Sequence, residues 1–188
     1  PPHNLNEVVD ATIYMIDNPN AGMEDLLKIV KGPDFPTGGI IYNKKDIHNA
    51  YASGRGGVVC RGEAESAEDE KGRSEILITS IPYNVNKADL ITKIADLVNE
   101  KKIEGIRDIR DESNKDGMRV VIELKQDSFP QNILNFLYKH TDLEKAFHFN
   151  MVALVDGLQP QTLSLKSILD YFIKHREVVV ERRARFDL

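Results

Sequence analysis

The sequence predicts an α+β protein in which antiparallel hairpins pack with helices. Two pairs of segments with period-two apolar alternation are each joined by a short polar turn, which is typical of β-hairpins. Segments with helical apolar spacing lie between and around these pairs without a regular strand–helix–strand repeat, which disfavours a doubly wound sheet. The 188 residues are 41% apolar, which is enough for a packed core.

Two helices are expected near the amino terminus. Over residues 4–17, Asn4 stands three residues before Glu7, as in a capping box. Six residues of this segment recur at helical spacing: Leu5, Val8, Val9, Thr12, Ile13 and Ile16. A shorter helix over 21–31 stops at Gly32-Pro33, because glycine favours a helix end and proline cannot continue one. The next segment, GPDFPTGG, is then an irregular loop.

A strand over 39–43 and a helix over 44–54 follow, and then a glycine-rich stretch, SGRGGVVCRGEAE. Gly54 and Gly56 would need a third glycine where Val59 stands to form a dinucleotide-binding loop, and no Gly-Lys-Ser/Thr follows to form a P-loop. A period-two run follows, in which Val59, Arg61 and Glu63 lie on one face and Val58, Cys60 and Gly62 on the other. The glycines therefore indicate a tight turn that leads into a strand.

Two hairpins and a helix are expected in the middle of the chain. The alternation from Val58 to about Ala67, the polar turn EDEKG and the segment RSEILITSI predict a long antiparallel hairpin. The helix over 84–101 has Asn86 as its cap. Its apolar stripe consists of Leu90, Ile91, Ile94, Leu97 and Val98. The segments 105–113 and 118–125, with Asp116-Gly117 in the turn between them, predict the second hairpin.

The last third of the chain predicts a helix over 130–140, a strand over 146–155 and a long helix from 163 to the last residue. The last helix lacks Gly and Pro, and its apolar residues lie near heptad spacing, which is typical of a coiled coil. It reaches residue 188 without a stop signal, so we expect the chain to be a fragment cut inside a long helix. The expected domains are residues 1–162 and the start of a coiled-coil arm over 163–188.

Composition and charge exclude several classes of protein. The longest apolar runs fall short of the roughly 20 residues that a bilayer crossing requires, and Pro-Pro-His does not resemble a signal peptide. The single cysteine, Cys60, excludes an internal disulfide framework, so a cytoplasmic location is expected. The net charge of −5 is uneven: residues 63–75 hold six acids and two bases, whereas residues 174–185 hold five Lys or Arg and two acids. Local patches decide which partners bind, so the total charge does not exclude nucleic acid.

No constellation in the sequence predicts catalysis or a metal site. The five histidines are scattered and none has the spacing of a zinc ligand pair. Four acids of the second hairpin could in principle bind Mg²⁺ or act as acid and base: Asp108, Asp111, Glu112 and Asp116. Basic residues interleave with them, which favours charge pairing on a solvated face. Cys60 shows no sign of activation. We therefore expect no catalytic residue, no metal ligand and no cofactor in this chain.

Basic residues provide candidate contacts to a phosphate backbone, since such contacts need only Lys, Arg and backbone N–H groups at reachable spacing. Lys44 and Lys45 begin a predicted helix, and Arg55 and Arg61 flank the glycines. These four residues are our DNA-binding candidates. The alternative is that they belong to an ordinary solvated surface.

Several long strings resemble, in order, the A subunit of bacterial DNA gyrase, a type IIA topoisomerase. The matching strings are PPHNLNEVVDA, GPDFPTGG, AYASGRGGVVCRGEAE, IPYNVNKADLITKIADLV, RDESNKDGMRVVIELK, FNMVAL and KHREVVVERRARF. The resemblance covers essentially the whole chain. Topoisomerase IV's A subunit shares much of the pattern, and DESNKDGMR favours gyrase.

The resemblance implies a place and a function for the chain. In the family this region is the tower domain, which lies between the winged-helix domain and the coiled-coil arms. The tower would hold the arms of the bent DNA duplex and tie that gate to the coiled coil. The parent would be an isomerase that cleaves both strands, passes a second duplex and reseals, in an A₂B₂ heterotetramer with the gyrase B subunit. The partner subunit would supply the Mg²⁺ and ATP sites.

The resemblance carries no catalytic residue onto this chain. The family's nucleophile is a tyrosine directly after an arginine, and none of the six tyrosines here follows an arginine. We expect this tyrosine upstream of Pro1, so the fragment alone should be inactive. Two other hypotheses remain open. One is a purely structural connector that does not touch DNA, and the other is a stand-alone enzyme that uses the acids near Asp111.

Overall fold

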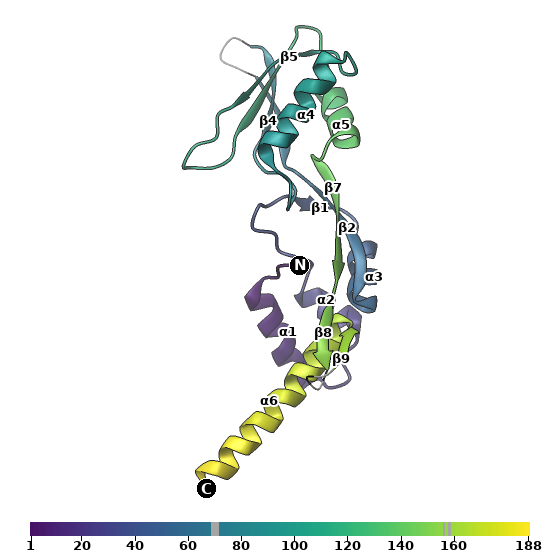
Figure 1. Cartoon of the computed structure of the whole chain (residues 1–188), viewed down its shortest axis with the longest axis vertical. Helices are drawn as coiled ribbons and strands as arrows, with labels where there is room; N and C mark the ends of the chain where they lie inside the picture. The colour runs from purple at the N-terminus through teal and green to yellow at the C-terminus, as the bar shows by residue number, and fades with distance from the viewer. Residues whose placement is uncertain (69–71, 156, 158) are drawn as a thin grey trace. The chain divides into compact units, whose positions relative to one another are not determined.

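The computed structural model describes residues 1–68, 72–155, 157 and 159–188 (Figure 1). Contacts divide the chain into two compact units. Unit one consists of residues 1–34, 43–58 and 147–188, and unit two consists of residues 35–42 and 59–146. The chain has helices and antiparallel sheets, which confirms the predicted α+β class. The expected domain boundary at residue 162 stays a prediction.

Unit one is mainly helical. Its elements are α1 (Leu5–Asp17), α2 (Met23–Ile29), α3 (Lys44–Ser53), β8 (Val152–Val155), β9 (Gln159–Thr162) and α6 (Leu165–Asp187). Two strands, β2 (Arg55–Arg61) and β7 (Glu144–Asn150), have residues in both units. Unit two holds β1 (Ile40–Ile41), β3 (Ala64–Glu68), β4 (Ser74–Ile78), α4 (Lys87–Asn99), β5 (Ile106–Asp111), β6 (Val120–Leu124) and α5 (Pro130–His140).

The predicted helices are present, with caps that the sequence indicates. The side chain of Asn4 accepts hydrogen bonds from the backbone N–H groups of Asn6 and Glu7 at the start of α1. Asn86 caps α4 in the same way, and Pro130 stands at the start of α5, where its missing N–H costs nothing. Helix α3 ends at Gly54, whose φ of 74° is in the left-handed region that favours glycine. Local capping chemistry therefore determines most helix ends.

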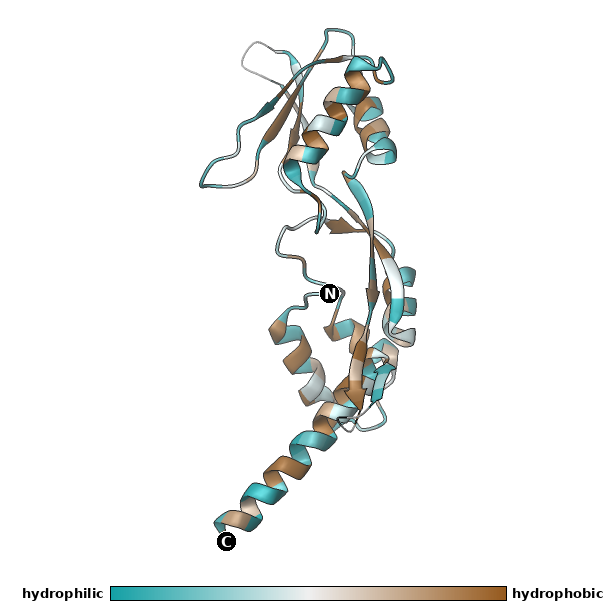
Figure 2. Cartoon of the chain, viewed as in Figure 1, coloured by the Kyte–Doolittle hydropathy of each residue, from teal (hydrophilic) through white to brown (hydrophobic). Residues whose placement is uncertain are grey.

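Helix α1 shows an unexpected distribution of exposure. Ala11 and Met15 are buried, whereas most of the residues that recur at helical spacing are exposed. Leu5 is 75% exposed, Ile13 52% and Ile16 58%. Figure 2 shows the apolar residues of this helix in brown. Within this chain, α1 packs through a narrow strip of residues and leaves an apolar face uncovered.

The prediction of one hairpin from Val58 to Ile81 is wrong in its first half. Strands β3 and β4 pair antiparallel, with Ala64 opposite Ile78 and Glu68 opposite Ser74, as predicted. Strand β2 belongs to a different sheet, of order β1-β2-β7. The change of partner occurs at Gly62, because its N–H donates to the Leu143 carbonyl, whereas the Glu63 carbonyl accepts from Thr79 and Ser80. The EDEKG turn lies partly outside the described residues.

The second hairpin is confirmed, and it completes a sheet of order β3-β4-β6-β5. The predicted strand over 146–155 is two strands, because β7 ends at Asn150 and β8 begins at Val152. Strand β8 pairs antiparallel with β9, which was not predicted from the sequence. A strand reading QPQT has no apolar alternation and contains a proline, so it carries little sequence signal.

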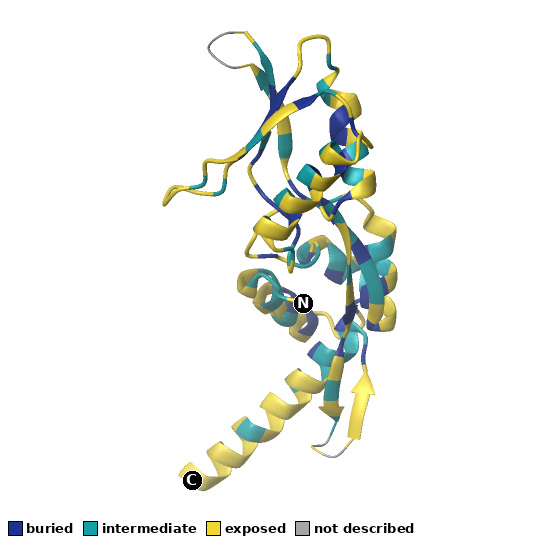
Figure 3. Ribbon diagram, turned by 45° about the horizontal axis from the view of Figure 1, so that its top comes forward, coloured by how far each residue is buried: buried dark blue, intermediate teal, exposed yellow. Residues whose placement is uncertain are grey.

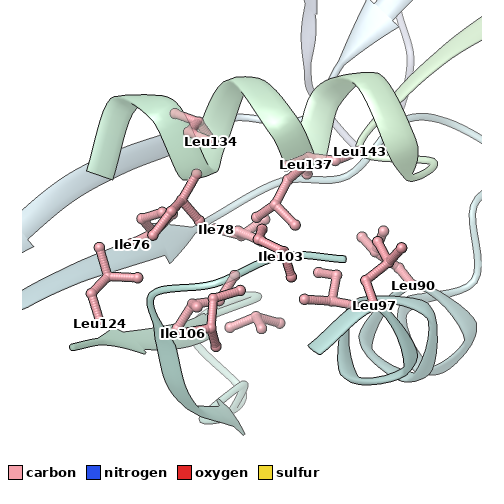
Figure 4. Close-up of a cluster of buried hydrophobic side chains, with 14 of the residues drawn as sticks. Ile76, Ile78, Leu90, Leu97, Ile103, Ile106, Leu124, Leu134, Leu137 and Leu143 are labelled. Carbon is pink, nitrogen blue, oxygen red and sulfur yellow. The ribbon is translucent and has the colours of Figure 1, made fainter. Parts of the chain in front are cut away.

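The core of unit two lies between its sheet and its two helices (Figure 4). Ile76 and Ile78 of β4 point toward Leu134 and Leu137 of α5. The predicted stripe of α4 is confirmed: Leu90, Ile94 and Leu97 are buried, and Ile91 and Val98 pack against the same cluster.

Unit one has its own buried residues around α3. Tyr51 is completely buried, and its hydroxyl lies 2.7 Å from Nε2 of His3. The ring of Phe149 contacts the ring of Tyr51. Among the described residues, no helix is both long and apolar enough to cross a membrane.

Candidate nucleic-acid interface

Lys44 and Lys45 form the first turn of α3. The Asn43 side chain caps this turn by accepting a hydrogen bond from the backbone N–H of Lys45 at 3.1 Å. The Asn43 amide donates to a carboxylate oxygen of Asp46 at 2.7 Å. Both lysines are exposed, and within the described part of the chain neither has an ion pair. The turn therefore presents two free ammonium groups, with one carboxylate close by.

The glycines of the stretch SGRGG place α3 directly on strand β2. A Cβ at Gly56 would lie 2.6 Å from the Cβ of Ala50, so only glycine allows this close approach of helix and strand. A Cβ at Gly57 would lie 2.7 Å from Nδ1 of His148. Gly54, which ends the helix, leaves no room for a side chain against the backbone of Leu163. The glycines thus serve packing and chain direction, in agreement with the interpretation that they do not form a nucleotide loop.

Arg55 begins β2, directly after the end of α3. It is exposed, and its guanidinium has no ion pair among the described residues. A helix of ten residues is about 15 Å long. Lys44 and Lys45 therefore stand at one end of α3 and Arg55 near the other. At about 3.4 Å per nucleotide, this separation corresponds to roughly four base pairs of a duplex.

Arg61 differs from the other three candidates and belongs to unit two. Its guanidinium forms an ion pair with Glu144. It also lies 4.8 Å from the ring centroids of both Tyr42 and Tyr138, which is the geometry of a cation–π contact. The hydrogen bond to Glu144 raises the pKa of Arg61 further. These contacts favour a structural role for Arg61, since a phosphate would have to compete with all of them.

His148 lies next to the start of β2. In the sequence it is only one of five scattered histidines. Its exposed ring lies against Gly57, two residues after Arg55 in the chain. A Gly-Gly pair inside a strand indicates that another group approaches the backbone closely. The Gly56-Gly57 pair is visible in the sequence, but it does not reveal that the approaching group is His148.

Two of the four acids of the second hairpin, Asp111 and Glu112, form ion pairs in the described part of the chain. Lys87 Nζ lies 2.6 Å from Asp111, and hydrogen bonds from Lys87 and Ser113 lower the pKa of Asp111 to about 2. Arg110 contacts Glu112 at 3.3 Å and also forms an ion pair with Glu123 of β6. This arrangement agrees with the interpretation that the charges pair on a solvated face.

No metal-binding cluster of three or more His, Cys, Asp or Glu side chains occurs within the described ranges. His3 hydrogen-bonds to Tyr51 and His140 stacks on Phe136, so each has a partner within its own unit. Cys60 is buried, and burial raises the pKa of its thiol. An activated cysteine would show the opposite shift.

Comparison with known families decides where the chain belongs. The family of DNA gyrase/topoisomerase IV A subunits matches residues 1–188. The chain belongs to this family. The resemblance inferred from the long matching strings is thereby confirmed.

Individual relatives from the gyrase/topoisomerase IV family support the same assignment. The DNA gyrase A subunit of Clostridium acetobutylicum is 53% identical over 188 residues, and that of Pseudomonas aeruginosa is 52% identical over 190. The DNA topoisomerase 4 A subunit of a Streptococcus pyogenes strain is 48% identical over 187 residues. All three alignments cover 100% of the chain, and they cover 22%, 20% and 23% of the respective relatives. The chain therefore spans about a fifth of the length of these proteins.

Proposed function

We propose that this chain is part of the DNA breakage-reunion subunit of a gyrase, an ATP-dependent type IIA topoisomerase that introduces negative supercoils. In this proposal the chain forms the tower, supports the arms of the bent gate duplex and links that gate to a coiled-coil arm that begins with α6. The match of the family to all 188 residues supports the parentage. The preference for gyrase rests on the names of the relatives and their identities.

The observation that supports DNA binding is the group of unpaired basic side chains at the two ends of α3. Lys44, Lys45 and Arg55 are exposed and have no ion pairs among the described residues, whereas Arg110 and Lys87 of unit two are paired with carboxylates. An unpaired cation can meet a phosphate without first losing a protein partner. Such contacts are independent of base sequence and sensitive to salt.

The chemistry of the parent lies outside this chain in the proposal. The nucleophilic tyrosine belongs to another part of the breakage-reunion subunit, and the B subunit supplies the ATP and Mg²⁺ sites of an A₂B₂ complex. The described residues are assigned no catalytic role. The chain contributes position, because it would hold phosphates along the duplex arms while strand cleavage occurs elsewhere.

Binding to a duplex across a salt series tests the DNA-binding part. With a duplex of roughly 30 base pairs, three phosphate contacts predict that log K falls with log salt at a slope of about −2.7. Affinity should then fall about 40-fold between roughly 50 and 200 mM salt. Replacing both Lys44 and Lys45 with Gln should reduce the slope to about −0.9.

The matched control is Lys28→Gln, which removes the same kind of charge from the same unit. Lys28 is paired with Asp25 at 2.9 Å on an exposed surface, so this variant should keep the full slope. A slope near zero in the unaltered chain would contradict direct DNA contact. An equal loss in the control would show that the effect is general charge rather than the α3 site.

A structural connector that does not touch DNA is the second candidate, and the contacts of Arg61 favour it. Arg61, one of the four DNA-binding candidates, is held by Glu144 and two tyrosine rings, as expected for a residue that stabilises the fold rather than contacting DNA. Charge reversal of Lys44, Lys45 and Arg55 in the full-length protein separates the two functions. Unchanged supercoiling and unchanged DNA wrapping would favour the connector.

The same full-length enzyme distinguishes gyrase from topoisomerase IV. Gyrase introduces negative supercoils into relaxed DNA when ATP is present. An enzyme that only relaxes and unlinks DNA would assign the chain to topoisomerase IV.

A further inference from the structure

Strands β2 and β7 are neighbours in one sheet, and α3 packs on one of their faces. A Cβ at Gly56 of β2 would lie 2.6 Å from the Cβ of Ala50 in α3. The ring of Phe149 in β7 contacts the ring of Tyr51, which also belongs to α3. All four residues lie in unit one. Gly56 and Phe149 therefore mark the face of the sheet that α3 covers.

The opposite face of these two strands is open to solvent. Successive residues of a strand point to opposite faces, so Arg55 and Gly57 of β2 point away from α3. For the same reason His148 and Asn150 of β7 point away from it. Toward the end of β7 exposed residues alternate with less exposed ones, which Figure 3 shows by burial colour. Arg55, His148 and Asn150 are all exposed, so this face presents a guanidinium and an imidazole to solvent.

The ring of His148 occupies the space of the side chain that Gly57 lacks. A Cβ at Gly57 would lie 2.7 Å from Nδ1 and 2.9 Å from Cε1 of this ring. The imidazole therefore lies over the strand that carries Arg55. Two residues of a strand span about 6.6 Å, which is about the rise of two nucleotides in a duplex. Arg55 and His148 are thus spaced to contact phosphates of one DNA strand.

Neither of these two side chains has a protein partner in the described part of the chain. The guanidinium of Arg55 forms no ion pair there, and the ring nitrogens of His148 form no hydrogen bond or ion pair there. His3, by contrast, hydrogen-bonds to Tyr51 in the same unit. A protonated imidazole has two N–H donors. Both donors of His148 are therefore available to an anion.

The charges around His148 couple its protonation to anion binding. Arg55 is the charged residue of β2 on this face within unit one. Asn150 is neutral and accepts a hydrogen bond from the Thr162 hydroxyl at 3.2 Å. The described residues of β8 and β9 carry no charge, and the charged residues of α3 lie on the other side of the sheet. A proton on His148 therefore adds a like charge beside Arg55, which is unfavourable until an anion joins them.

We propose that Arg55 and His148 form a phosphate-binding pair for the DNA backbone, in which His148 takes part when it is protonated. This pair rests on the proposed function and deepens it, because it adds a contact on the open face of β2 and β7 and makes DNA binding depend on pH. Histidine ordinarily changes charge between about pH 5 and 8. The affinity for a duplex should therefore rise as the pH falls through this range.

The salt series with a duplex, repeated at two pH values, tests the pair. The slope of log K against log salt should be about −2.7 at about pH 8 and about −3.6 at about pH 5.5, because a fourth phosphate contact adds about −0.9. His148→Gln keeps a polar side chain that cannot be charged, so its slope should be about −2.7 at both pH values. His148→Lys is charged at both, so its slope should be about −3.6 at both.

The matched control is His175→Gln, which removes another exposed histidine of unit one. This variant should keep the pH dependence of the unaltered chain. An equal loss in the control, or one and the same slope at both pH values in the unaltered chain, would overturn the pair and leave DNA contact by Lys44, Lys45 and Arg55 standing. Slopes near zero at both pH values would contradict the proposed function, and the pair with it.

A variant without the two lysines of α3 shows where the pH-dependent contact lies. With Lys44 and Lys45 both replaced by Gln, the slope should be about −0.9 at about pH 8 and about −1.8 at about pH 5.5. A slope in this variant that does not change with pH would overturn the pairing of His148 with Arg55.

Proton uptake gives an independent result. Isothermal titration calorimetry in two buffers of different ionisation enthalpy counts the protons that the unaltered chain takes up when it binds the duplex. At about pH 6.5 the unaltered chain should take up more protons than His148→Gln, because phosphate favours the charged imidazole. Equal uptake by the two proteins would refute the role of His148.

Discussion

Replacing Gly56 with alanine tests whether α3 rests on β2 as closely as the structure indicates. The added Cβ would lie 2.6 Å from the Cβ of Ala50. Carbon atoms in contact normally lie about 3.5–4.0 Å apart, so helix and strand must separate by about 1 Å. The φ of Gly56 is not positive, so its backbone itself accepts alanine. The expected cost therefore comes from packing.

The magnitude follows from two opposing effects. Overpacking a close contact costs about 1–3 kcal/mol, whereas replacing glycine stabilises by about 0.4–1 kcal/mol through the unfolded state. The free energy of unfolding should therefore fall by about 0.5–2.5 kcal/mol in Gly56→Ala. Urea unfolding followed by circular dichroism measures this change, and the transition of unit one should carry it.

A double-mutant cycle with Ala50→Gly identifies the contact responsible. Ala50→Gly alone should cost about 1 kcal/mol through helix propensity. In the double variant the nearest remaining atom is the Cα of residue 50, 3.0 Å from the new Cβ, so only part of the clash is relieved. The double variant should be more stable than additivity predicts by about 1 kcal/mol. Additive effects, or a Gly56→Ala variant more stable than the original chain, would refute the packing of α3 on β2.

Three further predictions concern single side chains. Leu137→Ala should lower the free energy of unfolding by about 2–5 kcal/mol, because Leu137 is completely buried in the core of unit two. The control Leu154→Ala should change this free energy little, because Leu154 is 65% exposed. Similar effects of the two changes would contradict the core shown in Figure 4. Lys87→Met should raise the pKa of Asp111 from about 2 toward the usual carboxyl value, as seen by NMR titration. Because the pKa of Asp111 is lowered in the folded state, the stabilisation that this carboxylate provides is present at neutral pH and is lost as the pH falls toward about 2. An unchanged titration of Asp111 in the variant would show that Lys87 is not its partner. Cys60 should react with a thiol reagent only after unfolding, since the residue is 1% exposed and burial raises its pKa, so a rapid native-state reaction would place it at the surface.

Helix positions and caps could be predicted from the sequence because they depend on neighbours in the chain. Asn86 caps α4 and Gly54 ends α3, and each acts on backbone groups only a few residues away. The prediction of an apolar stripe on α4 was correct because the residues at helical spacing are also the residues that the fold buries. The same spacing in α1 did not reveal that Ile13 and Ile16 are exposed, since periodicity indicates which residues share a face but not what covers it.

The candidate interface was predictable only in part. The exposed charges of Lys44, Lys45 and Arg55 agree with their expected place on the surface, whereas nothing in the local sequence showed that Glu144 and two tyrosine rings hold Arg61. Those partners come from residues 42, 138 and 144, and long-range side-chain contacts of this kind have no local signal.

By itself, the sequence determined the α+β class, most helices, the second hairpin and the family, because these depend on local periodicity, capping residues and long matching strings. Only the tertiary structure decided that the alternation around Gly62 is divided between two sheets. Backbone hydrogen bonds there go to Leu143 on one side and to Thr79 and Ser80 on the other, and strand pairing between distant residues is not encoded in alternation. It also decided that the glycines of SGRGG bring α3 onto its strand, since glycine permits close approach but the neighbour that approaches comes from the fold.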